Sequence, residues 1–225
     1  YPHTTAVVVH GLQLASSNDI AIVPGVLENG IAWLKNHQAE QVTKLRNYPK
    51  EKKPWKTHVD NIDAFVYMVL VDAGHDNVAM RDFLYRDRQH LAVYAKAMFG
   101  LALYSVKDQE KLDMIVRNIE QFVVHDAENE TAYLQQPDSY WWYWYGSENE
   151  AMARYLQLLL KVNPDNQTAP RLVKYLLNNR KHGTYWKSTR DTAVVVEAMA
   201  DYLSATKEDQ PNMTVEVFVD GNLQK

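Results

Sequence analysis

Two kinds of helical segment alternate along this chain, and this alternation restricts the fold more than any other feature of the sequence. Segments such as 63–73 (DAFVYMVLVDA) and 191–203 (DTAVVVEAMADYL) are rich in small and apolar residues, so they can be buried on several sides. The segments between them, such as 111–123 (KLDMIVRNIEQFV), show a single apolar stripe. Inner and outer helices that alternate in successive hairpins indicate a helical solenoid or a closed helical ring.

Local signals fix where several of these helices begin and end. Asp108 is a favourable N-cap, Gly74 is a natural C-terminal stop, and Ser147 with Glu150 forms the pattern of a capping box. Residues 126–146 interrupt the helical pattern, and we expect little strand structure before the C-terminus. The helices are predicted over 4–16, 24–45, 61–73, 78–86, 91–106, 108–124, 147–162, 168–179 and 190–205.

The C-terminal segment 213–219 (MTVEVFV) alternates polar and apolar residues, which is the pattern of a β-strand, and the Asp220-Gly221 pair after it favours a turn. A lone strand has no partner for its backbone groups, so we expect it to pair poorly. The sequence therefore predicts a helical domain over 1–208, followed over 209–225 by a linker and the first strand of a β domain.

Composition excludes several classes of function. The 225 residues contain no cysteine, which removes disulfides, zinc–thiolate sites and cysteine nucleophiles. The net charge is −4 with acidic and basic residues interspersed, and no nucleic-acid-binding module is recognisable, so we expect no nucleic acid partner. The longest apolar runs are too short for a membrane-spanning helix.

Three segments resemble the thioester-type helical domain of the alpha-2-macroglobulin and complement family. They are 183–203 (GTYWKSTRDTAVVVEAMADYL), 4–15 (TTAVVVHGLQLA) and 26–38 (VLENGIAWLKNHQ), and the order of the helices extends the resemblance over residues 4–205. The resemblance implies a partial α/α toroid of alternating inner and outer helices, truncated at its N-terminus, with a short C-terminal β-strand.

The resemblance also implies a function without catalysis. The family's reactive element is an internal thioester formed by a Cys-x-Glu-Gln motif, which cannot exist in a chain without cysteine. The chain would then be a domain of a broad-spectrum protease inhibitor of the bacterial periplasm or envelope, with neighbouring β domains and target proteases as partners and no cofactor. In relatives, a loop histidine or tyrosine approaches the thioester, and Tyr48 and His58 are the corresponding candidates here.

Other residues have both a functional and a structural interpretation. His58, Asp60 and Asp63 offer metal-ligand atoms, but Asp60 also suits the N-cap of the helix over 61–73, and we expect no metal. Glu148 and Glu150 could be a general acid and base, although the capping box explains them without catalysis.

The aromatic run 140–145 (YWWYWY) could be a sugar-binding platform or a protein interface. Because the run directly precedes a capped helix, we predict that Trp141, Trp142 and Trp144 are largely packed. The alternative function is a helical-ring enzyme or binding domain that acts on polysaccharide or lipid.

Overall fold

The computed structural model of the chain describes residues 1–50, 52, 54–135, 147–208, 216–219 and 222–224. Within these residues the protein is mostly helical, which confirms the all-α character predicted from the sequence. The helices are α1 (Pro2–Ser17), α2 (Val26–Asn47), α3 (Asn61–Asp72), α4 (Val78–Arg86), α5 (Val93–Ser105), α6 (Gln109–Glu120), α7 (Glu148–Val162), α8 (Thr168–Asn178) and α9 (Thr189–Thr206), with short 3-10 turns η1 (Tyr48–Lys50) and η2 (Arg88–His90).

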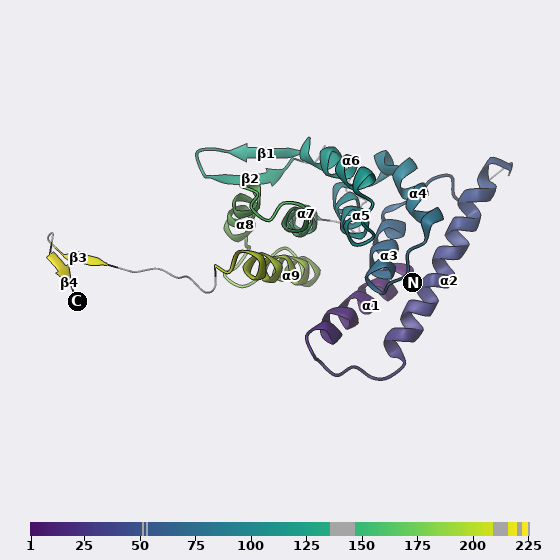
Figure 1. Cartoon of the computed structure of the whole chain (residues 1–225), viewed down its shortest axis with the longest axis horizontal. Coiled ribbons are helices and arrows are strands. Elements are labelled where there is room, and N and C mark those ends of the chain that lie inside the picture. The colour runs from purple at the N-terminus through teal and green to yellow at the C-terminus, as the bar shows by residue number, and fades with distance from the viewer. Residues whose placement is uncertain (51, 53, 136–146, 209–215, 220–221, 225) are drawn as a thin grey trace.

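The helices of the described residues pack in two layers (Figure 1). The odd-numbered helices form an inner layer, in which α1 contacts α3, α3 contacts α5, α5 contacts α7, and α7 contacts α9. Even-numbered helices cover this layer: α2 packs on α1 and α3, α4 on α3, α6 on α5, and α8 on α7. The two kinds of helix seen in the sequence therefore correspond to two layers.

Burial separates the two layers as their compositions predict only for the central inner helices, because α1 and α9 at the two ends of the inner layer bury just a few residues each. In the inner layer every residue of 63–71 in α3, of 93–100 in α5 and of 150–160 in α7 is buried. The outer helices α6 and α8 bury residues three or four apart, which is one helical stripe each. Burial of apolar area at about 25 cal/mol per Å² makes this inner layer the main source of stability.

Lys96 is an exception within the apolar interior of α5. Its side chain is buried, and its Nζ donates a hydrogen bond to the Leu91 carbonyl oxygen at 2.5 Å. Burial lowers the pKa of this lysine, because the apolar surroundings disfavour the charged ammonium.

The limits of α3 follow from its sequence. Asp60 Oδ1 accepts hydrogen bonds from the backbone amides of Ile62 and Asp63, and the Asp63 carboxylate accepts one from the Asp60 amide. These reciprocal bonds form a capping box that begins the helix. The helix ends two residues before Gly74, whose φ of +80° suits glycine. The N-cap predicted at Asp60 and the stop predicted at Gly74 are both confirmed.

A β-hairpin follows α6, where the sequence predicted that the helix would continue to residue 124. Strands β1 (Val123–Asp126) and β2 (Thr131–Leu134) are antiparallel, and their turn is closed by Asp126 Oδ1, which accepts from the amides of Glu128 and Asn129. The hairpin lies over α8 and α7 (Figure 1). The strand structure before the C-terminus is thus limited to this short hairpin within the described residues, whereas the predicted continuation of the helix to residue 124 was wrong.

The C-terminal strand is not alone. Strand β3 (Val217–Val219) pairs antiparallel with β4 (Asn222–Gln224), so the expectation of an unpaired strand was wrong. Figure 1 shows this second hairpin apart from the helical layers. Residues 213–215 and the predicted turn at 220–221 lie outside the described part of the chain.

A close approach between α5 and α7 depends on Gly100. A Cβ atom at this position would lie 2.7 Å from Leu158 Cδ2 in α7 and 3.4 Å from Ile115 Cγ2 in α6. The glycine therefore lets two inner helices pack more closely than a larger residue would permit.

We predict that Gly100→Val lowers the free energy of unfolding by about 2 to 3 kcal/mol, because the added methyl groups overpack the contact with Leu158. The matched control is Gly11→Val in α1, where a Cβ meets no atom within 4 Å. Urea unfolding should separate the two variants, with the control changing stability by less than about 1 kcal/mol. Equal losses would contradict the assignment of a packing role to Gly100.

Candidate functional site

The inner helices begin at the same end of their layer, which we call the N-terminal face. Asn61 at the start of α3 accepts a hydrogen bond through Oδ1 from the amide of Ala92, the N-cap of α5, at 2.8 Å. Ser147, the N-cap of α7, donates from Oγ to Asp191 Oδ1 in the first turn of α9 at 2.7 Å. The first turns of neighbouring inner helices are therefore side by side.

Charge interactions between side chains show that the other inner helices also begin at this face. Burial raises the pKa of Tyr94 in α5, and the nearby charge of Glu150 in α7 adds to the increase. Burial lowers the pKa of His3 in α1, and the charge of Arg190 in α9 lowers it further. The N-terminal face thus includes the beginnings of α1, α3, α5, α7 and α9.

An ion cluster lies where α3 begins. Lys56 Nζ is 2.6 Å from Asp63 Oδ2 and 2.8 Å from Asp60 Oδ2. Burial and the charge of Asp60 raise the pKa of the buried Asp63 to about 6, although Lys56 acts in the opposite direction. Burial would lower the pKa of Lys56, but the two carboxylates outweigh it and raise that pKa. The cluster ties the loop before α3 to the first turn of the helix.

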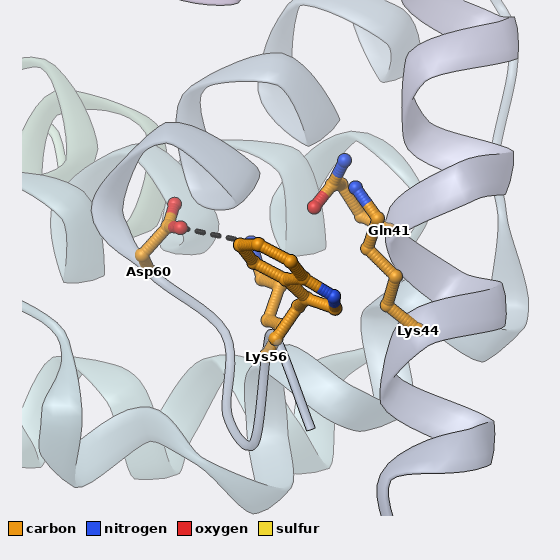
Figure 2. A pocket seen from close by; sticks show the side chains of 5 residues that line it. Gln41, Lys44, Lys56 and Asp60 are labelled. Carbon is orange, nitrogen blue, oxygen red and sulfur yellow. Dashed lines mark hydrogen bonds and ion pairs between the residues drawn. The ribbon is translucent and has the colours of Figure 1, made fainter. Parts of the chain in front are cut away.

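A cavity of about 460 Å³ opens beside this cluster. Figure 2 shows Lys56 and Asp60 joined on one side, with Gln41 and Lys44 of α2 opposite them. Trp55 also lines the cavity and is 94% exposed, whereas Gln41 is almost completely buried. The cavity therefore combines polar side chains with one exposed indole ring.

The two predicted loop residues, Tyr48 and His58, lie near this cavity but do not line it. The Tyr48 ring lies 6.0 Å from the guanidinium carbon of Arg86, and the His58 ring packs edge-on against His90 with centroids 4.5 Å apart. Asp87 fixes the same loop by accepting a hydrogen bond from the Val59 amide at 3.1 Å. Both residues thus pack against the segment formed by the end of α4 and η2, and their role near a thioester stays a prediction.

The proposed metal ligands separate in the structure. His58 contacts His90, whereas Asp60 and Asp63 face Lys56. Over the part of the chain that is described, no three His, Asp or Glu side chains gather in a way that could hold a metal ion.

Glu148 and Glu150 have different environments at the start of α7. Glu148 is exposed, whereas Glu150 is buried and forms an ion pair with Arg190. Burial raises the pKa of Glu150, although Arg190 acts against this increase. Ser147 Oγ accepts from the Glu150 amide, so the predicted N-cap is confirmed. The Glu150 carboxylate binds Arg190, so the predicted capping box is only half present.

The aromatic residues Trp141, Trp142 and Trp144 lie outside the described residues, so the prediction that they are packed stays a prediction.

A polar network deep between α1, α7 and α9 was not predicted from the sequence. Glu197 accepts hydrogen bonds from Arg154 Nη1 and Gln157 Nε2, both at 3.0 Å, and its Oε1 lies 3.1 Å from His10 Nε2. Burial alone would raise the pKa of Glu197, but the hydrogen bond with His10 and the charge of Arg154 lower it to about 2. The sequence signal that could have revealed this network is the occurrence of polar residues within otherwise apolar helical segments.

Comparisons with known proteins identify no relative of this chain. No protein family matches the chain, and no curated protein matches it. Among the described residues, no helix is both long and apolar enough to cross a membrane.

We predict that Lys56→Met lowers the free energy of unfolding by about 3 kcal/mol, because it leaves Asp63 buried beside Asp60 without a cation. Lys44→Met is the matched control, since Lys44 lines the same cavity but is exposed. Chemical denaturation of both variants checks the prediction. A loss for Lys44→Met as large as that for Lys56→Met would refute the role assigned to the ion cluster.

We also predict that Glu197 contributes an acid-dependent part of the stability. Its folded-state pKa of about 2 lies below the ordinary value of 4.5, so its contribution is present above pH 4.5 and is lost as the pH falls toward 2. The contribution is about 3 kcal/mol. Urea unfolding at several pH values should give a shallower pH dependence for Glu197→Gln, whereas Glu148→Gln, which removes an exposed carboxylate outside the network, should keep the wild-type slope.

Proposed function

We propose that this chain is a non-enzymatic helical domain of a bacterial alpha-2-macroglobulin-like protease inhibitor, built as a partial α/α toroid. The alternation of inner and outer helices supports this proposal. The observation that carries it furthest is the 3.1 Å contact between His10 and Glu197, because it joins the first inner helix to the last one. An inner layer that curves around a common axis would bring its first and last helices toward each other in this way.

The absence of catalysis is supported by how the acidic groups of the N-terminal face are used. Asp60 and Asp63 bind Lys56, and Glu150 binds Arg190. A general acid or base must reach a substrate, whereas these carboxylates join elements of the fold. Covalent capture through a thioester would require a cysteine, and the chain contains none.

The domain then contributes shape to a larger protein of the periplasm or cell envelope. It presents a docking surface to neighbouring β domains, while capture of target proteases depends on a bait region elsewhere in the parent. Cleavage of such a bait region rearranges the surrounding domains, and a compact helical domain would move as one body during this change.

We predict that the 225-residue chain neither inhibits trypsin nor retains labelled methylamine under denaturing conditions, because it has no thioester sulfur and no bait region. Residual trypsin activity and gel-retained label are the measurements, with a thioester-containing alpha-2-macroglobulin as positive control. Stoichiometric inhibition, or label that survives denaturation, would overturn the proposal.

The parent gene distinguishes this proposal from the alternative of a helical-ring enzyme acting on polysaccharide or lipid. Flanking β domains and an upstream bait region support the inhibitor. A gene that encodes only this helical domain behind a signal peptide would refute it and favour the enzyme.

A further inference from the structure

One stripe of α2 leads directly to the cavity beside Lys56. The stripe consists of Trp33, His37, Gln41 and Lys44, which are spaced by four, four and three residues and so lie on one side of the helix. At 1.5 Å per residue, the stripe extends over about 16 Å of the helix. Its last two residues line the cavity, so the stripe and the cavity form one continuous surface.

Aromatic rings occur at both ends of this surface. The rings of Trp33 and His37 are stacked, with centroids 5.5 Å apart and planes within 4°. Trp33 is 42% exposed, and Trp55, at the cavity, is 94% exposed. Both indole rings therefore present apolar surface to water, which the apolar face of a ligand can cover by stacking.

The polar groups on the cavity wall supply both donors and acceptors. Gln41 offers an amide, Lys44 an ammonium and Asp60 a carboxylate, all on the cavity wall. The charge of Lys56 is offset by Asp60 and Asp63, so the wall lacks the excess of positive charge that a polyanion would require. Four of the five lining residues are polar or charged, which disfavours a lipid chain, because a lipid chain needs apolar side chains around it.

We propose that the α2 stripe and the cavity bind an uncharged oligosaccharide. Sugar rings carry apolar C–H faces that stack on indoles, and hydroxyl groups that each need a donor or an acceptor. The two exposed tryptophans offer rings on which sugar faces can stack. Gln41, Lys44 and Asp60 offer donors and acceptors for the hydroxyl groups. The length of the stripe suits several sugar units in a row. This site does not depend on the protease-inhibitor assignment, because Trp33, Trp55 and Lys44 take no part in the argument for that function.

Calorimetric titration of the full chain with cellohexaose, chitohexaose and maltohexaose tests the proposal. At least one hexasaccharide should bind with a Kd below about 1 mM. Trp55→Ala and Trp33→Ala should each weaken that binding by about tenfold, since each removes one stacking platform. Tyr104→Ala is the matched control, because Tyr104 is 42% exposed like Trp33 but lies in α5, and it should leave the affinity unchanged.

Three results would overturn the proposal. The first is that none of the three sugars binds, and the second is that both tryptophan variants bind as tightly as the unmodified chain. The third is tighter binding, with the same tryptophan dependence, of hexagalacturonate or of a decaproline peptide, which would assign the surface to a polyanion or to a protein segment. Circular dichroism of each variant ensures that a lost affinity reflects the removed ring and not unfolding.

Discussion

Helices α3, α5 and α7 have almost no side left for solvent, and most of the structure follows from this constraint. A helix buried on all sides needs a covering layer, which α4, α6 and α8 provide. It also begins with backbone amides that have no partner within the helix, so each buried beginning needs a cap. Asp60 and Ser147 meet this need for α3 and α7. Because the inner helices begin at the same end, their caps collect into one polar face.

Positive helix ends and buried carboxylates explain the charge pattern of that face. The beginning of each helix carries partial positive charge, and the parallel inner helices add these charges together at one end. Asp63, Glu150 and Asp191 are buried there. Asp63 binds Lys56 from the preceding loop, and Glu150 binds Arg190 from α9. Each ion pair therefore joins two different elements, so removal of one partner would leave a buried charge and loosen the contact between them.

The sequence predicted the local features of this fold well and its distant contacts poorly. The caps at Asp60 and Ser147 depend on residues three positions apart, so they can be recognised without a structure. The β1–β2 hairpin was missed because the apolar spacing of α6 continues into Val123, which made the helix seem longer. The contact between His10 and Glu197 spans 187 positions, and no local pattern specifies such a pair. The cavity escaped prediction for the same reason, since α2 and the loop before α3 form it together.

The burial of Lys96 has a consequence for the chemistry of the folded chain. An acylating reagent reacts with the uncharged form of an amine that it can reach, and burial shifts Lys96 toward that form while keeping the reagent away from it. Its Nζ donates to the Leu91 carbonyl oxygen from within α5, so a reagent meets it only when this part of the inner layer opens. The extent to which Lys96 becomes acylated, relative to the exposed lysines, therefore records how often the centre of the protein opens under native conditions.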